Sequence, residues 1–258
     1  MLETIAIERD GGVATLRLAR PGKKNAMSRL MIDEIAEAAR ILAADDAVRV
    51  VVLAAEGDVF CAGGDLGWMR EQMDADGPAR AEGARALAGM LGAVDALPKP
   101  VIGRIHGSAF GGGLGLVAVC DVALGAQDAR FGFTETRLGL VPATIGPYVV
   151  ARMGGAAARR VFMSGRQFTA REAVDLGLLA VSVLPAELDA AVAAHAEPYL
   201  SAAPGAVAAA KALARRLGGA PTPEDVEASV AALVARWESS EAREGIAAFF
   251  DRRPPPWR

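Results

Sequence analysis

The sequence predicts an α/β fold, with parallel strand pairing in the first half of the chain and helices in the rest. Short runs rich in Val, Ile and Leu, which are typical of strands, alternate there with glycine-containing turns and a long amphipathic helix. Strands separated by helices of this length favour parallel pairing. The expected strands are residues 4–9, 13–19, 48–54, 101–106, 122–125 and 130–133.

Local signals define the elements that connect these strands. The tripeptide Asp10-Gly11-Gly12 indicates a hairpin between the first two strands. Ser28 is a preferred N-cap residue, and the apolar periodicity after it predicts a helix over 28–44. A further helical region, 66–96, is interrupted at Asp76-Gly77-Pro78.

Beyond about residue 143 the strand signal fades and helices are expected. The segments are 144–153, 156–164, 170–176, 187–200, 206–217, 223–237 and 240–250. Pro204-Gly205 separates the last three from the rest, so we expect a core domain over 1–199 and a helical oligomerisation region over 200–258. The alanine-rich helices of that region favour docking on another subunit.

Composition excludes several classes of function. The formal net charge is −3 and no basic run occurs, which argues against a nucleic-acid surface. The N-terminus lacks a basic segment followed by an apolar one, and no apolar stretch is long enough to span a bilayer, so a cytoplasmic protein is expected. The two cysteines, Cys61 and Cys120, have no partner histidines and indicate neither a metal site nor a disulfide.

The run Gly111-Gly112-Gly113-Leu114-Gly115 opens a segment that otherwise has the composition of a buried helix. Each glycine in a helix costs about 0.5–1 kcal/mol relative to alanine, so this sequence is locally unfavourable. A helix N-terminus without side chains exposes N–H groups and the positive end of the helix dipole. The run therefore indicates a site for a phosphate or an oxyanion, with a tight turn followed by close helix packing as the alternative.

Five ordered segments resemble the crotonase superfamily, that is, the enoyl-CoA hydratase/isomerase fold. They are 21–27 (PGKKNAM), 60–66 (FCAGGDL), His106-Gly107 with the glycine run, 131–142 (FGFTETRLGLVP) and 249–254 (FFDRRP). The resemblance implies a spiral of ββα units with a helical C-terminal trimerisation region, assembled as a homotrimer or a dimer of trimers. It also implies an acyl-CoA substrate, with coenzyme A entering as part of the substrate and no other cofactor.

The chemistry that this resemblance implies is stabilisation of a thioester enolate. The two oxyanion-hole donors would be the backbone N–H groups of Gly64 and Gly112, and the catalytic carboxylate would be Glu135. The coenzyme A portion would lie near residues supplied by three parts of the chain. These are Lys24, Asn25, Ala26, Ala62, Gly64, Asp65, Leu66, Phe249 and Arg252, the last two from a neighbouring subunit. Asp65 also has the position of an N-cap for the helix that follows it.

One position departs from the pattern of ordinary hydratases in the family, which use two glutamates. Glu135 matches the second glutamate, but Gly115 stands at the position of the first. The surrounding segments resemble bacterial hydratases of branched glutaconyl-CoA esters, of the methylglutaconyl and isohexenylglutaconyl types. Gly115 would then leave room beside the double bond for a substituent, while Arg137 is expected to be an ion-pair partner rather than a carboxylate ligand.

The sequence therefore predicts an enoyl-CoA hydratase acting on an α,β-unsaturated acyl-CoA, branched or carrying a second carboxylate. Several alternatives stay open, because a lone carboxylate also suits other reactions of an enolate. They are a Δ3,Δ2-enoyl-CoA isomerase, an acyl-CoA decarboxylase and a non-catalytic CoA-binding homologue.

Overall fold

Two β-sheets form the framework of the chain, whose computed structural model describes residues 2–257. The larger sheet has six strands in the order β1-β2-β3-β5-β7-β10, and the smaller has four in the order β4-β6-β8-β9. The strands are β1 (Ile5–Asp10), β2 (Val13–Leu18), β3 (Val50–Ala55), β4 (Val59–Cys61), β5 (Val101–Ile105), β6 (Ser108–Phe110), β7 (Val122–Ala126), β8 (Arg130–Gly132), β9 (Gln167–Thr169) and β10 (Val181–Val183). Consecutive strand pairs, β3/β4, β5/β6 and β7/β8, each supply one strand to each sheet, which confirms the expected ββα repetition.

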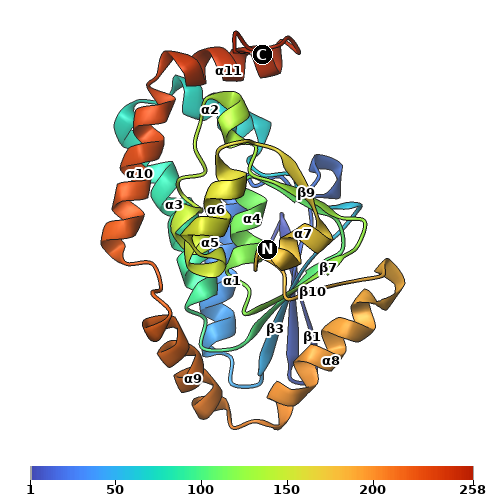
Figure 1. Cartoon of the computed structure of the whole chain (residues 1–258). Helices are drawn as coiled ribbons and strands as arrows, with labels where there is room; N and C mark the ends of the chain where they lie inside the picture. The colour runs from blue at the N-terminus through green and yellow to red at the C-terminus, as the bar shows by residue number, and fades with distance from the viewer. Residues whose placement is uncertain (1, 258) are drawn as a thin grey trace.

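Helices and short 3-10 turns connect and cover these strands (Figure 1). The helices are α1 (Arg29–Ala44), α2 (Leu66–Asp74), α3 (Gly77–Asp95), α4 (Gly112–Ala118), α5 (Gly146–Met153), α6 (Gly155–Phe162), α7 (Ala170–Asp175), α8 (Leu188–Ser201), α9 (Pro204–Leu217), α10 (Pro223–Trp237) and α11 (Ser240–Phe250). The 3-10 turns are η1 (Pro21–Lys23), η2 (Glu135–Leu138) and η3 (Pro185–Glu187). The first hairpin is antiparallel, and β2, β3, β5 and β7 pair in parallel, as the sequence predicts.

The prediction that strands end near residue 143 is wrong. β9 pairs antiparallel with β8, and β10 pairs parallel with β7. Each has three residues, so neither contains enough alternation to produce a strand pattern. The short strands β4 and β6 escaped prediction for the same reason, yet both lead directly into the glycine-rich segments of interest.

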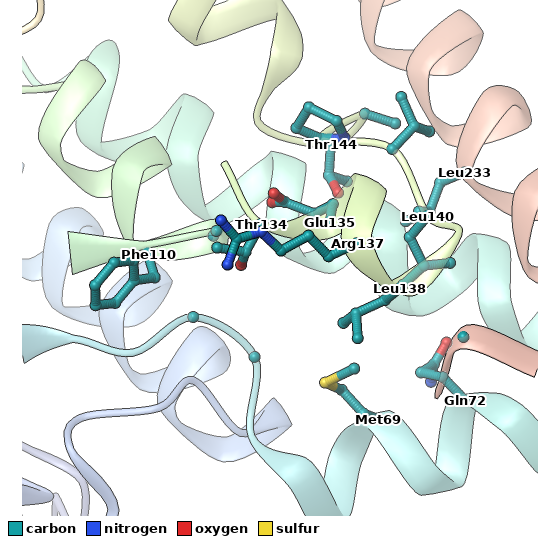
Figure 2. A pocket seen from close by; sticks show the side chains of 18 of the residues that line it. Met69, Gln72, Phe110, Thr134, Glu135, Arg137, Leu138, Leu140, Thr144 and Leu233 are labelled. Carbon is teal, nitrogen blue, oxygen red and sulfur yellow. The ribbon is translucent and has the colours of Figure 1, made fainter. Parts of the chain in front are cut away.

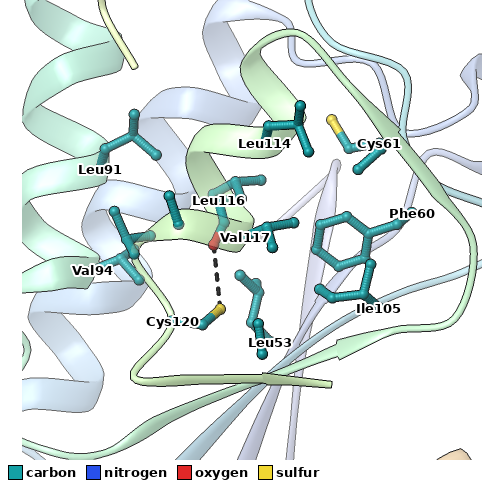
Figure 3. Close-up of a cluster of buried hydrophobic side chains, with 14 of the residues drawn as sticks. Leu53, Phe60, Cys61, Leu91, Val94, Ile105, Leu114, Leu116, Val117 and Cys120 are labelled. Carbon is teal, nitrogen blue, oxygen red and sulfur yellow. Dashed lines mark hydrogen bonds between the residues drawn. The ribbon is translucent and has the colours of Figure 1, made fainter. Parts of the chain in front are cut away.

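The central core lies on one face of the six-stranded sheet and surrounds α4. All residues of α4 after Gly112 are buried, and they pack with Leu53, Phe60 and Ile105 from three strands and with Leu91 from α3 (Figure 3). The opposite face of that sheet is covered by α8 through Leu188, Val192 and Ala196. Burying one such side chain stabilises the fold by about 1.5–3 kcal/mol, so the start of α4 is held rigidly in place.

Both cysteines belong to this core. Burial raises the pKa of the Cys61 and Cys120 thiols to about 12. Cys120 Sγ also approaches the Leu116 carbonyl oxygen at 3.2 Å, a contact drawn in Figure 3. These thiols are protonated packing groups at neutral pH.

The C-terminal helices run along the outside of the core rather than forming a separate body. Figure 1 shows α10 beside α3, and Leu140 from the loop after η2 packs with Trp237 and Ile246 of the last two helices. α9 has no buried residue, and Leu213 and Leu217 are exposed on it. Two ion pairs anchor α9 to the core, Lys211–Asp121 at 2.7 Å and Arg215–Asp95 at 2.7 Å.

Candidate active site

The glycine run forms a sharp turn from β6 into α4. Gly111 has φ 50°, in the left-handed region that favours glycine, and its N–H donates to the Gly132 carbonyl oxygen at 3.0 Å. Gly112 follows as the first residue of α4. The N–H of a first helical residue has no intrahelical acceptor. The turn therefore aims an N–H group away from its own helix.

A second glycine turn lies opposite, between β4 and α2. Gly63 has φ 96°, its carbonyl oxygen accepts from Met27 N at 2.8 Å, and Asp65 N donates to the Met27 carbonyl oxygen at 2.9 Å. This pattern is a parallel bridge between Met27 and Gly64, and it leaves the N–H of Gly64 on the side away from Met27. Within residues 2–257, neither the Gly64 N–H nor the Gly112 N–H donates a hydrogen bond.

Both glycines line a cavity of about 820 Å³. Its walls come from α2 and α3, from the loop between η2 and α5, and from α10 and α11 (Figure 2). The lining is predominantly apolar, with Met27, Trp68, Leu87 and Phe110 among its members. A large apolar pocket with a few convergent polar groups is the usual form of a small-molecule site.

Glu135 is the single acidic residue among those that line the cavity. It is the first residue of η2, and Figure 2 shows its side chain directed into the pocket. A Cβ built on Gly111 would lie 3.3 Å from Glu135 Oε1, so the carboxyl group sits beside the start of α4. Burial raises its pKa to about 7, and Oε2 has no hydrogen-bond partner within the described residues. Such a carboxyl group is suited to exchange protons near neutral pH.

The space beside Gly115 is filled by the protein. A Cβ at this position would fall 2.7 Å from Ile145 Cγ2 and 2.9 Å from Leu91 Cδ1. The expectation that Gly115 leaves room for a substituent of the substrate is therefore wrong in this structure. Ile145 lines the cavity beside Gly115. Where ordinary hydratases of the family have a second carboxylate, this pocket therefore has an isoleucine side chain.

Arg137 also differs from expectation. It makes no ion pair within the part of the chain that is described; its stem packs beside Gly165, and the residue lines the cavity. Figure 2 shows the guanidinium lying across the pocket on the same side as Glu135. Among the described residues, the Arg137 guanidinium in this pocket is therefore not paired with a carboxylate.

The residues expected around coenzyme A divide into two groups. Those that line the cavity are Ala62, Gly64, Leu66 and Phe249. Those outside the lining are Lys24, Asn25, Ala26, Asp65 and Arg252. Phe249 lines the pocket of its own chain, although the sequence analysis expected it from a neighbouring subunit.

Three residues of the second group have structural contacts. Asn25 is buried with φ 51°; its Oδ1 accepts from Arg20 N at 2.9 Å and its Nδ2 donates to two carbonyl oxygens, those of Glu56 and Val59. Asp65 is the N-cap that the sequence predicts, accepting from Gly67 N at 2.8 Å, and it also pairs with Arg20 at 3.0 Å. The Lys24 carbonyl oxygen accepts from Ala62 N at 3.0 Å, which fixes this loop against the turn at Gly63 and Gly64.

Apart from Phe249, sequence reasoning missed the residues that the C-terminal part of the chain contributes to the same pocket. Leu233, Trp237 and Trp257 line it, together with Thr144 from the loop before α5. No local pattern marks these residues, because their role depends on how α10 and α11 fold back over the core. Among residues 2–257 there is no cluster of three metal-ligating side chains, and none of the described helices has the length and hydropathy needed to cross a bilayer.

Comparisons with known proteins agree with this architecture. The family model described as "Enoyl-CoA hydratase/isomerase" matches residues 8–258. The enoyl-CoA hydratase ACTT6 of Alternaria alternata is 33% identical over 245 residues, which cover 92% of this chain and 78% of that protein. The crystal structure of an enoyl-CoA hydratase from Mycobacterium avium superposes with a TM-score of 0.89 at 33% identity, covering 100% of both chains. That of an enoyl-CoA hydratase from Shewanella pealeana gives 0.82 at 35% identity, covering 99% of this chain and 96% of the other. The chain belongs to the enoyl-CoA hydratase/isomerase family, the crotonase superfamily.

Proposed function

We propose that this enzyme adds water to an α,β-unsaturated acyl-CoA. The observation that carries the proposal is the arrangement of one carboxyl group, Glu135, beside two unengaged N–H groups, those of Gly64 and Gly112, in one apolar cavity. A thioester carbonyl oxygen bound between the two N–H groups gains negative charge during the reaction. Preorganised donors stabilise that charge, and the loss of one typically costs about 10²–10³-fold in rate.

The single carboxyl group handles the proton in both halves of the reaction. Glu135 takes a proton from water while the water oxygen bonds to C3, and the electron pair of the double bond moves onto the thioester oxygen to give the enolate. The protonated Glu135 then donates this proton to C2 as the carbonyl re-forms. Water is thereby added across the double bond, and Glu135 returns to its starting state.

The coenzyme A portion extends from the two glycines toward the loop that contains Lys24, Asn25 and Ala26. The adenine lies near that loop and Ala62–Leu66, and Lys24 meets the phosphates, for which an ammonium group is a suitable partner. Phe249 completes the pocket from α11 of the same chain, and Arg252, which lies outside that lining, contributes from a neighbouring subunit. Asn25 contributes by shaping the loop, since its side chain is already hydrogen-bonded within the chain.

The acyl group carries a second carboxylate, as in glutaconyl-type esters. Arg137 supports this proposal because it lines the cavity and lacks an acidic partner within residues 2–257. A guanidinium binds a carboxylate through two parallel hydrogen bonds. Arg137→Gln should raise KM at least tenfold for a carboxylated enoyl-CoA and leave KM for an uncharged straight-chain ester unchanged. Equal changes for both esters would refute the carboxylate proposal.

An isomerase is the second candidate, and the presence of one carboxylate in the pocket lining favours it over reactions that need two groups. Supplying a conjugated enoyl-CoA separates the candidates. Hydration removes the ultraviolet absorbance of the conjugated thioester and adds the mass of water to the product, whereas isomerisation conserves the mass. Carbon dioxide release from a dicarboxylic ester would identify a decarboxylase, and binding without turnover a non-catalytic homologue.

The helical region 200–258 serves assembly into a homotrimer or a dimer of trimers. Support comes from α9, which buries none of its own residues and exposes Leu213 and Leu217. Sedimentation of the full chain measures the assembly directly. Leu217→Glu should shift the protein toward smaller species, and a profile identical to that of the unmodified protein would argue against this surface.

A further inference from the structure

Thr144 presents an unpaired hydroxyl group to the catalytic cavity. It lies in the loop that joins η2 to α5, only 6% of the residue is exposed, and it lines the pocket. Within residues 2–257, Thr144 Oγ1 has no hydrogen-bond partner. The hydroxyl oxygen is not fully enclosed by protein atoms and opens onto the cavity, so water or a bound molecule there is its expected partner.

The backbone around Thr144 fixes where this hydroxyl lies. Leu140 N donates to the Glu135 carbonyl oxygen at 3.0 Å, which ties the loop to η2. Gly146 N donates to the Ala143 carbonyl oxygen at 2.8 Å, so Thr144 and Ile145 form the centre of a tight turn. Figure 2 shows Thr144 and Glu135 on the same side of the pocket. Within residues 2–257, Glu135 Oε2 is a buried polar atom that also has no hydrogen-bond partner.

The neighbour of Thr144 explains why a hydroxyl is needed at this place. Ile145 Cγ2 occupies the position that a side chain at Gly115 would require, so α4 supplies no polar group to this part of the pocket. An attacking water has two hydrogens, and Glu135 accepts one of them. A second acceptor fixes the direction of the water lone pair relative to the double bond.

We infer that the Thr144 hydroxyl is this second acceptor and positions the attacking water for Glu135. This inference rests on the proposed hydration and specifies how one carboxylate suffices for it. The water donates one hydrogen to Glu135 and the other to Thr144 Oγ1, and its oxygen then bonds to C3. Only the first proton moves to Glu135, so Thr144 remains unchanged by the reaction. Thr144 is a positioning residue for water and has no role when no water attacks.

Because Thr144 acts only when water attacks, a reaction of the same enolate without water attack tests its role. In deuterated water, Glu135 and the two N–H groups suffice to exchange the α-protons of a saturated acyl-CoA, because enolisation involves no attack by water. We compare hydration and α-proton exchange in Thr144→Val, which removes the hydroxyl at nearly constant volume, and in Thr144→Ser, which keeps it. Thr136→Val is the matched control, since Thr136 lies on η2 outside the cavity lining.

Thr144→Val should lose about tenfold in kcat for hydration, a typical effect of one hydrogen bond, and retain α-proton exchange. Thr144→Ser should recover hydration, and Thr136→Val should match the unmodified enzyme in both assays. Equal losses of hydration and exchange in Thr144→Val would overturn the inference, as would wild-type hydration in that variant. A hydration-specific loss in Thr134→Val, with none in Thr144→Val, would transfer the role to the other cavity-lining threonine and also refute it.

Failure of the proposed function gives a different result. If the unmodified enzyme exchanges α-protons but adds no water to any enoyl-CoA tested, the proposed hydratase function is refuted. The proposed role of Thr144 is then refuted as well. If the unmodified enzyme hydrates and Thr144→Val does so equally well, the hydration stands and only the inference about Thr144 fails.

Discussion

The Cγ2 methyl group of Ile145 lies 2.7 Å from the position that a Cβ on Gly115 would occupy. This relationship couples the end of the η2–α5 loop to the middle of α4. A glycine at 115 is therefore required by packing, and the second carboxylate of ordinary hydratases in the family cannot be restored by one substitution. The two positions must change together.

Gly115→Glu alone should destabilise the protein by about 1–3 kcal/mol, the usual cost of inserting atoms into a packed core. Combining it with Ile145→Ala removes Cγ2 and should recover part of that loss, since Leu91 Cδ1 still lies 2.9 Å from the new Cβ position. The double variant should also hydrate a straight-chain enoyl-CoA faster than Ile145→Ala does. Chemical denaturation and absorbance assays measure the two effects.

The comparison with Ile145→Ala matters because that variant has the enlarged pocket without the new carboxylate. If the single variant Gly115→Glu were as stable as the unmodified protein, the packing relationship would be refuted. If the double variant and Ile145→Ala hydrated at the same rate, a carboxylate at this position would have no catalytic value here.

Glu135→Gln should lower kcat for hydration by about 10²–10⁴-fold, because the amide cannot accept a proton from water. Affinity for the acyl-CoA should change little, since the N–H groups of Gly64 and Gly112 remain. Steady-state kinetics with binding by calorimetry separate the two quantities. Retention of full activity in this variant would eliminate Glu135 as the catalytic group.

The pH dependence of the reaction should reflect the same carboxyl group. Burial raises the pKa of Glu135 to about 7, and only the carboxylate form accepts a proton from water. The value of kcat/KM in the hydration direction should therefore fall as the pH decreases through about 7. A profile that stays flat down to pH 5 would contradict this environment for Glu135.

Glu135 should also affect stability in a pH-dependent manner. The pKa of the Glu135 carboxyl group in the folded protein lies above the ordinary value of 4.5. The contribution of this group to the stability of the folded state is therefore complete below about pH 4.5 and is lost as the pH rises through about 7. Glu135→Gln should therefore gain stability relative to the unmodified protein across this window, on the order of 2–3 kcal/mol. Urea denaturation at pH 5 and pH 8 measures the change, and Glu56→Gln on the surface should keep the original dependence.

Gly112→Ala tests the close packing around the start of α4. The new Cβ would lie 2.5 Å from Met27 Cε, and Met27 lines the cavity, so its terminal methyl must move into the space for the thioester. We expect a loss of about 10²-fold in kcat, which is typical of a displaced reacting group. Gly155→Ala should leave activity unchanged, because no atom lies within 4 Å of its Cβ position.

Met27→Leu, added to Gly112→Ala, should restore part of this activity, since leucine has no atom at the position of Cε and such swaps cost under about 1.5 kcal/mol. Equal activities of the single and double variants would show that Met27 is not the obstacle.

The features that the sequence predicted well are those encoded by local chemistry. The N-caps Ser28 and Asp65 follow from what single residues can do at a helix start. The long strands β2, β3 and β5 follow from runs of branched apolar residues. The family resemblance added Glu135, which no local pattern distinguishes from any other glutamate.

The features that the sequence could not predict depend on tertiary contacts. β9 and β10 have three residues each and exist because a neighbouring strand is available to pair with. Ile145 is 30 positions away from Gly115, and no sequence pattern links the two residues. The Ile145 methyl group contacts this glycine only because α5 packs against α4. Arg137 was expected to have an acidic partner, but the fold places it at a pocket wall where Glu135 is the one acidic lining residue.

A crystal structure with a bound, non-reactive enoyl-CoA analogue would show where the thioester carbonyl oxygen lies relative to the two glycine N–H groups. The thioester carbonyl oxygen should lie about 2.7–3.1 Å from both the Gly64 and the Gly112 backbone nitrogens, with Glu135 facing C2 and C3. A carbonyl oxygen that accepts hydrogen bonds from other groups, with both glycine N–H groups left free, would contradict this arrangement.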